Sequence, residues 1–479
     1  MLRLILKQTN WSVLGAVFGF AVGFFIKIYL VNKVGLLSYG SYVIGQTMAS
    51  TFDTFLAIGI PYVIIRYIPS FLEKDKGKAM SLAAFSLKYS LIIGSLFAIL
   101  IFCLSDEIAT VVYRKEGISF ILSLMALYIP LSLYMGMITA LYRAVLKVKE
   151  IIIYGTILSV SVRAILTFVI FQFTTDISYF IFIELFTQIL TLSILTLNFH
   201  RNEFALNYPV NLKLCEESSL LDYGKQMFLN SVVMFLGGQS LAFLIGIYLP
   251  SDQVGAYGIL ITFANLTVFL LINLNRIFAP AISKLYDDNK IEELNELYKK
   301  TTFIINVITV PFAVLLMLFS SEVLSLYGEE MKNYNFYLII LMLGSIISLS
   351  AGSSGTIMVM AGLERKNLKI QFIKALLTIG LAIILIPIYS FNAVVFLYVG
   401  CMIFLNVFQL IYIYINIRIS PFSTDLLYVY LIASPVIVYS LLNTEQFQLL
   451  DFFIIPIGFM TLYLILLKKP ILEIVKLMR

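Results

Sequence analysis

Charged side chains stand inside long apolar stretches of this 479-residue sequence, where a charge has to serve some purpose. A charge at the centre of a membrane-spanning helix costs about 2.5 to 3.5 kcal/mol on insertion scales, so each such side chain needs a partner, water or a function. Most of these charges are cations, and a water-filled cavity with excess positive charge attracts anions such as a diphosphate. The candidates are Lys27, Asp53, Lys88, Arg163, Glu184 and Lys374, with Arg66 and Arg276 at the ends of apolar stretches.

Depth in the predicted helices separates these candidates. At about 1.5 Å per residue, Asp53 lies roughly 18 Å and Arg163 roughly 15 Å from the nearer end of its stretch, beyond the reach of snorkelling. Glu184, roughly 10 Å deep in the next stretch, is close enough for an ion pair with Arg163. Such a pair would either serve a substrate or only hold two helices together.

The other cations have a simpler alternative explanation. Lys27, Lys88 and Lys374 lie close enough to a helix end to snorkel to the surface. Arg66 and Arg276 either bind a ligand or anchor their helices at the cytoplasmic face.

Polar and small residues in the apolar stretches also allow two interpretations. The polar stripe of Gln239, Asn265, Asn273 and Asn275 either lines a cavity or bonds between helices. The run SAGSSG, residues 350–355, is either a helix break beside a cavity or an intact, weakly packed helix. The small-residue spacing of Gly15, Gly19 and Gly23 allows a close helix approach, for tight packing or for sliding.

The elements that carry these residues are membrane-spanning helices. The sequence is 61% hydrophobic and 13% charged with a mean hydropathy of +0.98, which excludes a soluble globular protein. We count about fourteen apolar runs, from 11–31 to 450–467, each suited to cross about 30 Å of hydrocarbon as a helix. With both termini cytoplasmic, about 25 of the 33 basic residues face the cytoplasm. The net charge of +6 therefore faces the inner leaflet, and no basic patch indicates nucleic acid.

Three weak matches at one offset indicate an internal duplication. YIPSFLEKDKGKAM, which begins at Tyr67, matches AISKLYDDNKIEEL, which begins at Ala281, about 214 residues later. The matched turns are six helices apart, so the two halves are parallel repeats. The predicted divisions are a first six-helix bundle over 1–198, a cytoplasmic connector over 199–225, a second bundle over 226–417, and two extra helices with a cytoplasmic tail over 418–479.

Enzyme motifs are absent from the sequence. The only histidine, His200, cannot supply HExxH, a catalytic triad or a histidine-rich metal site. GLLSYGS, from Gly35, lacks the lysine of a phosphate loop. We therefore predict no enzyme activity, no cofactor and no metal.

Several loose motifs, taken in order, resemble one transporter family. They are VGLLSYGSYVIGQ, LAIGIPYVIIRYIP, YRAVLKVKE, DQVGAYGI, FAPAISKLY and the region from AGLERKN to LIPIYSFNA. With them the chain resembles the Wzx-type flippases of lipid-linked oligosaccharides for polysaccharide and O antigen, in the superfamily of MATE exporters and lipid II flippases.

The resemblance implies two six-helix bundles around a central cavity and export of a polyprenyl-diphosphate-linked glycan by alternating access. Lys27 resembles the basic residue that related flippases use on the diphosphate. Asp53 stands where lipid II flippases carry an arginine, so it either pairs with Lys27 or binds a coupling ion.

Our leading hypothesis is an inner-membrane flippase for an anionic lipid-linked oligosaccharide. Lys27, Arg163, Lys88, Arg66 and Arg276 are its predicted substrate-binding residues, and Asp53 and Glu184 its charge-switching or ion-coupling residues. The alternatives are a cation-coupled MATE-type drug exporter, an enzyme acting on a lipid-linked sugar, and a non-transporting scaffold. Expected partners are the glycan lipid and membrane lipids; coupling to H+ or Na+ and contact with polysaccharide assembly proteins stay open.

Overall fold

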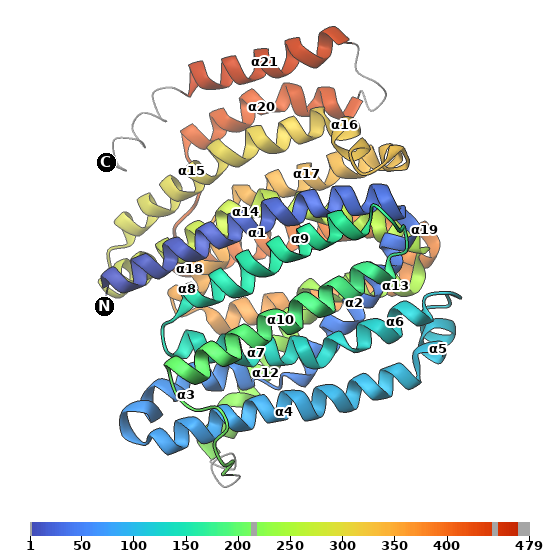
Figure 1. The fold of residues 1–479 in the computed structure, drawn as a ribbon. Coiled ribbons are helices and arrows are strands. Elements are labelled where there is room, and N and C mark those ends of the chain that lie inside the picture. Colours follow the sequence, from blue (N-terminus) through green and yellow to red (C-terminus); the bar gives the residue numbers. More distant parts are fainter. Residues whose placement is uncertain (1, 212–217, 443–448, 468–479) are drawn as a thin grey trace. The chain divides into compact units, whose positions relative to one another are not determined.

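A computed structural model describes residues 2–211, 218–442 and 449–467, without the side chains of 2–10, 12, 13, 276, 277 and 449–453. Every regular element in these ranges is helical (Figure 1). Among the described residues, ten helices are long and apolar enough to cross a membrane, or up to twelve if each of two bent pairs forms one span. The prediction of an all-helical, multi-pass membrane protein is therefore confirmed.

The predicted number of fourteen spans stays a prediction. Helix α19, Glu364–Ile417, has 54 residues, about 81 Å at 1.5 Å per residue, which exceeds one bilayer crossing. Non-helical backbone at Ser390 (φ 49°, ψ −131°) kinks it near its middle. The last helix, α21, covers Leu449–Leu466, and its side chains are described from Ile454 onward.

The chain divides into two compact units, an N-terminal unit of residues 1–255 and a C-terminal unit of residues 256–479. The predicted bundles, connector and tail stay predictions. Residues 212–217 of the connector and residues 443–448 and 468–479 of the tail lie outside the described part of the chain.

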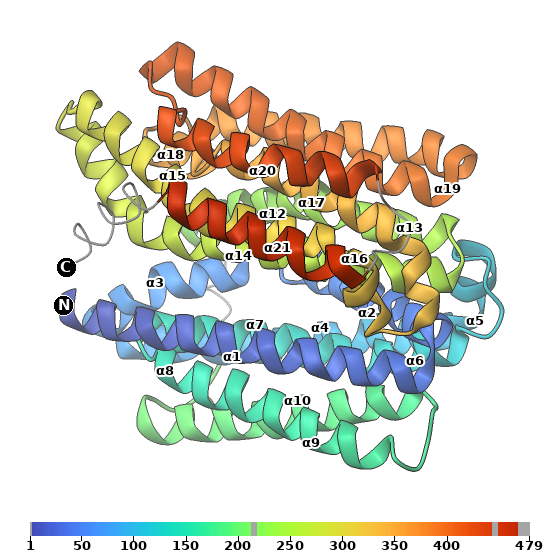
Figure 2. The same cartoon turned by 90° about the horizontal axis from the view of Figure 1, so that it is seen from above.

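The N-terminal unit is built from helices that run alongside one another (Figures 1 and 2). They are α1 (Leu2–Val34), α2 (Leu36–Leu56), α3 (Ile60–Lys74), α4 (Lys76–Cys103), α5 (Ser105–Glu107), η1 (Ile108–Val112), α6 (Ser119–Ala126), α7 (Tyr128–Ala144), α8 (Val148–Glu150), η2 (Ile151–Leu158), α9 (Ser159–Ile170), α10 (Ser178–Asn202), α12 (Ser218–Gly238), α13 (Ser240–Tyr248) and the start of α14 (Ser251–Asp287).

The second predicted span is broken into two helices. Helices α2 and α3 meet at an angle of 47°. Gly59 takes a left-handed conformation (φ 71°) at the break, which glycine adopts without steric cost. The charged turn that follows α3 ends at Asp75, whose side chain accepts a hydrogen bond from the Lys78 backbone N–H (3.2 Å) and so caps α4.

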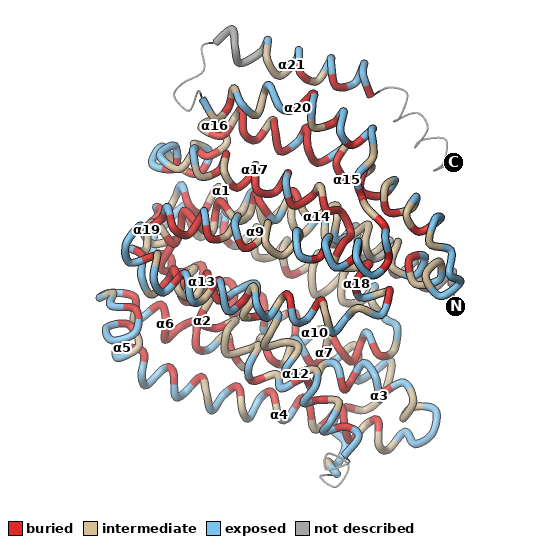
Figure 3. The backbone as a smooth tube through the Cα atoms, turned by 180° about the vertical axis from the view of Figure 1, so that it is seen from behind, coloured by how far each residue is buried: buried red, intermediate tan, exposed pale blue. Residues whose placement is uncertain are grey.

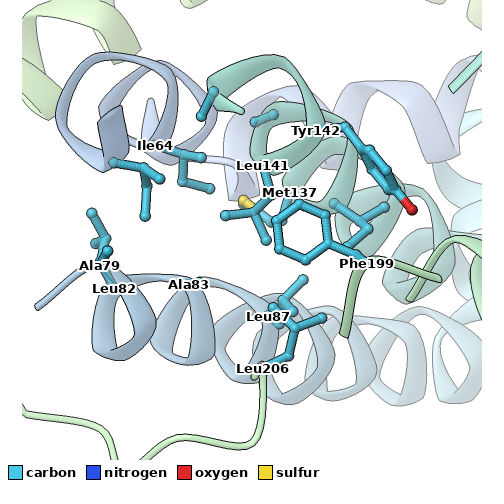
Figure 4. Close-up of a cluster of buried hydrophobic side chains, with 14 of the residues drawn as sticks. Ile64, Ala79, Leu82, Ala83, Leu87, Met137, Leu141, Tyr142, Phe199 and Leu206 are labelled. Atoms are coloured by element: carbon cyan, nitrogen blue, oxygen red, sulfur yellow. The ribbon is translucent and has the colours of Figure 1, made fainter. Parts of the chain in front are cut away.

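Helices α3, α4, α7 and α10 of the N-terminal unit enclose an apolar core (Figure 4). Ile64, Met137, Leu141 and Phe199 in this core are fully buried. On its outward side, α4 exposes a row of large apolar side chains, and its exposed positions recur along the tube in Figure 3. These are Leu91, Ile92, Leu96, Ile99 and Leu100. An exposed face of this kind suits hydrocarbon rather than water.

Two glycines let α2 and the start of α14 approach closely. A Cβ added to Gly40 would lie 1.6 Å from the carbonyl oxygen of Ser251, and one added to Gly255 would lie 2.7 Å from that of Leu36. Nearby, the Lys115 ammonium donates a hydrogen bond to the Gly246 carbonyl, and desolvation by burial lowers the pKa of Lys115 to about 8.

In its described part, the C-terminal unit holds most of α14 and the elements that follow it in the chain (Figure 2). These are α15 (Ile291–Leu318), α16 (Ser320–Ser325), η3 (Glu329–Tyr334), α17 (Asn335–Ser350), α18 (Ser354–Met360), α19, α20 (Thr424–Leu442) and α21 (Leu449–Leu466).

The run SAGSSG breaks the helix, so of its two interpretations the structure selects the break. Helix α17 ends at Ser350 and α18 begins at Ser354. Gly352 between them has φ +55°, and a Cβ there would lie 2.1 Å from Thr302 Oγ1. Both the backbone conformation and the space at this position therefore require glycine.

Candidate functional site

A cavity of about 240 Å³ lies among α1, α2, α9 and α10 of the N-terminal unit. It is lined by three of the predicted site residues, Lys27, Arg163 and Glu184, together with Tyr42 and Gln46. The structure thus brings together side chains from four helices. The two most distant of the three predicted site residues, Lys27 and Glu184, are 157 positions apart in the sequence (184 − 27).

Arg163 and Glu184 form the ion pair whose feasibility the sequence indicated. Arg163 Nη1 lies 2.9 Å from Glu184 Oε1, and the Tyr42 hydroxyl donates to Glu184 Oε2 at 2.9 Å. The Glu184 side chain is 5% exposed and that of Arg163 23%. Because both carboxylate oxygens are engaged, Glu184 ties α2 and α9 to its own helix, α10.

Arg163 keeps hydrogen-bonding capacity beyond this pair. A guanidinium carries five N–H donors. Arg163 Nε is buried and has no hydrogen-bond partner among the described residues. An anion that enters the cavity therefore finds a cation whose fork is only partly used.

Helix α1 contributes Lys27 and open space to the same cavity. Gly15 and Gly19 pack tightly, since an added Cβ would lie 2.4 Å from Ile152 Cγ2 and 3.0 Å from Thr156 Cγ2. Gly23 has no atom within 4 Å of such a Cβ and lines the cavity with Lys27. The small-residue spacing thus serves tight packing at two positions and leaves room at the third.

The cavity lining carries excess positive charge. Its charged residues are two cations, Lys27 and Arg163, and one anion, Glu184, a formal sum of +1. This sum favours an anionic ligand over a cationic one.

The remaining predicted site residues lie elsewhere. Asp53, on α2, lies beside the Ser132 side chain of α7. The Arg66 guanidinium stacks over the ring of Tyr223 at 4.2 Å, and Lys88 is exposed on α4. None of the three is among the residues that line the cavity, and their proposed roles stay predictions.

Two further cations belong to the other unit. The side chain of Arg276 lies outside those that the structure describes. Lys374, on α19, is half-buried.

Tyr42 and Gln46 did not stand out in the sequence. Their i, i+4 spacing places them on one face of α2, but 29 tyrosines occur in the chain and nothing distinguishes this one. Only the position of Glu184 across the interface gives Tyr42 its role.

The fold is that of a class of membrane flippases and transporters. The structure is similar to a lipid II flippase MurJ in an inward closed conformation, with a TM-score of 0.76 and 16% identity over 98% of this chain and 100% of that chain. It is also similar to a multidrug resistance MATE family transporter of the MOP superfamily in an inward-facing conformation, with a TM-score of 0.66 and 14% identity over 86% of this chain and 94% of that one.

The sequence gives the family within this class. The family described as polysaccharide biosynthesis protein matches residues 36–335, and the chain belongs to it. A capsular polysaccharide biosynthesis protein CapF of Staphylococcus aureus is 34% identical over 120 residues, 25% of this chain and 30% of that protein. The match therefore spans less than a third of this curated relative. The resemblance seen in the sequence is confirmed at the level of family and fold.

Proposed function

We propose that this protein moves an anionic polyprenyl-diphosphate-linked oligosaccharide from the cytoplasmic to the outer leaflet by alternating access, during cell-surface polysaccharide synthesis. The observation that carries the proposal is the excess positive charge of the Lys27, Arg163 and Glu184 cavity. A diphosphate is an anion that an ammonium and a guanidinium bind together, the first as a point charge and the second as a planar fork.

In this proposal Glu184 is the charge switch. Its carboxylate occupies one edge of the Arg163 guanidinium, so an entering phosphate competes with it for the same cation. Substrate binding would then loosen the link that Glu184 makes among α2, α9 and α10. Asp53 is a second candidate for switching or for binding H+ or Na+.

Membrane potential supplies a driving force in the outward direction. Moving one charge across the membrane changes its free energy by about 2.3 kcal/mol per 100 mV. At about 100 mV, negative inside, outward movement of a diphosphate with two negative charges is therefore favourable by roughly 4.6 kcal/mol. The proposal accordingly places the protein in the cytoplasmic membrane with both termini cytoplasmic, where polysaccharide assembly proteins would supply or receive the glycan.

A MATE-type drug exporter is the alternative, because the fold is shared with transporters of that kind. An exporter of cationic drugs needs excess negative charge in its cavity. The formal sum of +1 at the Lys27 cavity favours the glycan lipid instead.

The test measures lipid-linked oligosaccharide in cells that lack the gene. Inner and outer pools are separated by their accessibility to an added glycan-modifying enzyme. We expect complete oligosaccharide to accumulate in the inaccessible pool, and the wild-type gene to restore export. An unchanged pool with altered drug tolerance would support the exporter.

Site variants then test the cavity itself. Lys27→Ala and Arg163→Ala should each reduce export at least tenfold at wild-type expression, because each removes a charge-assisted hydrogen bond to phosphate, worth about 1.5 to 3 kcal/mol. Lys290→Ala, which removes a cation from an exposed ion pair with Glu293, is the matched control and should export normally. Normal export by both cavity variants would refute the site.

A further inference from the structure

The C-terminal unit contains a second polar cavity with a different chemistry. Its volume is about 420 Å³, and it lies among α14, α18 and α19. The described residues that line it include no charged side chain. Its polar lining consists of carboxamides and two hydroxyls: Asn275, Ser354, Thr356, Asn367, Gln371, Asn406 and Gln409.

A hydrogen-bond network holds the buried side of this cavity in place. Gln409 Nε2 donates to Asn367 Oδ1 at 2.8 Å, and Ser354 Oγ donates to Gln409 Oε1 at 2.8 Å. Asn406 Nδ2 donates to Ser348 Oγ at 2.7 Å and to the Met402 carbonyl at 2.9 Å. Both ends of the Gln409 amide are used, so its orientation is fixed.

The same network leaves donors and acceptors for a ligand. Asn367 uses its oxygen and Asn406 its nitrogen, so the opposite end of each amide, one NH₂ group and one carbonyl, is available. Asn275 Oδ1 is buried and has no hydrogen-bond partner among the described residues. A buried acceptor without a partner is costly, and a ligand hydroxyl would satisfy it.

The break in the SAGSSG run makes room for the cavity. Gly352, Ser354 and Gly355 all lie on its wall. A Cβ on Gly355 would lie 3.2 Å from Gln409 Nε2, so a larger residue would press on the amide that organises the network. The helix break, which the sequence indicated as one of two possibilities, therefore forms part of the cavity wall.

We propose that this cavity binds an uncharged, hydroxyl-rich group of the class of a neutral sugar residue. The inference rests on the proposed function and specifies the glycan part of its substrate. Carboxamides offer a donor and an acceptor side by side, which matches neighbouring hydroxyls of a sugar ring. A charged group would find no opposite charge among the described residues of the lining, and an apolar group would leave the amides unpaired.

The test compares two lipids in proteoliposomes that contain the full-length chain. One is polyprenyl diphosphate bearing a neutral oligosaccharide and the other is polyprenyl diphosphate without sugar. The readout is the ratio of their flipping rates. We expect Asn275→Ala and Gln371→Ala each to lower the ratio about threefold to tenfold, the effect of a lost hydrogen bond.

Two comparisons separate the possible outcomes. Asn416→Ala, which alters an exposed amide of α19 outside the cavity, should leave the ratio unchanged. If the wild type moves both lipids and both cavity variants, folded to the wild-type melting temperature, keep its ratio, the sugar site is refuted while the proposed function stands. If the wild type moves neither lipid, the proposed function is refuted and the sugar site with it.

Discussion

The two polar cavities of this chain stabilise their buried polar side chains in different ways. In the N-terminal unit, Glu184 forms an ion pair with Arg163 and accepts a hydrogen bond from the Tyr42 hydroxyl. In the C-terminal unit, carboxamides and hydroxyls satisfy one another around Gln409 and no described lining residue is charged. The difference suggests a division of labour, since charge attracts a phosphate from a distance whereas amides distinguish hydroxyl patterns at contact.

Glycines serve two different purposes in this chain. Gly40 and Gly255 allow two backbones to touch, so they are required by their neighbours. Gly352 is required by its own backbone conformation as well, because its φ is +55° where a helix is interrupted. Gly59, at the break between α2 and α3, also has a positive φ (71°), so a glycine marks the helix break in both units.

Removing the anion of the charged cavity should have the largest effect on stability. Glu184→Ala leaves Arg163 without a counter-ion and Tyr42 without an acceptor, and breaking a buried pair in this way costs about 3 to 5 kcal/mol. Thermal unfolding of the full-length protein in detergent would measure the loss.

The double variant Arg163→Met/Glu184→Leu separates structure from function at the same site. It should recover most of the lost stability, because Arg163 is no longer left buried without its counter-ion, but should not restore export. A Glu184→Ala variant that unfolds within about 1 kcal/mol of wild type would show that the pair contributes little to holding the helices together.

Disrupting the neutral hydrogen-bond network around Gln409 should lower the free energy of unfolding by less than Glu184→Ala does. Gln409→Leu deprives Ser354 and Asn367 of their partner, and leaving a buried neutral group unsatisfied costs about 1 to 3 kcal/mol. Asn416→Leu on the same helix is the control, with an expected change of less than about 0.5 kcal/mol because the side chain is exposed. If Gln409→Leu lowered the free energy of unfolding as much as Glu184→Ala does, the expected difference between neutral and charged buried groups would be wrong.

Substitution of Gly352, at the break between α17 and α18, should destabilise the protein for two reasons that can be measured separately. Gly352→Ala places a Cβ against Thr302 and forces alanine into a left-handed conformation, together costing about 1 to 3 kcal/mol. Adding Thr302→Ala should relieve the collision but not the backbone strain, so recovery in unfolding measurements should be partial. Full recovery would mean that the conformation at residue 352 imposes no cost.

Replacing Gly23, in the charged cavity, by alanine should change the stability of the protein least, and it should raise the stability rather than lower it. Gly23 is helical and has no atom within 4 Å of an added Cβ, so Gly23→Ala should stabilise by about 0.5 to 1 kcal/mol. Gly15→Ala is the contrasting variant, since its Cβ would lie 2.4 Å from Ile152 and should destabilise. Equal responses would contradict the assignment of open space to Gly23.

The class of fold could be predicted from the sequence because hydropathy and helix length are local properties. A run of apolar residues shows that a segment crosses the membrane, and position along that run gives the depth of Arg163 or Glu184. The family followed from motifs in their order along the chain, and the match over residues 36–335 confirms it.

The sequence also indicated a possible Arg163–Glu184 pair, but it did not determine which charges share a cavity. Depth along a helix says nothing about which face of the helix meets a neighbour, and packing alone sets that face. Packing therefore placed Lys27 and Tyr42 with the pair and left Asp53 with Ser132. It also decided between a broken and an intact SAGSSG helix, because the collision that excludes a side chain at Gly352 comes from Thr302, fifty residues away (352 − 302).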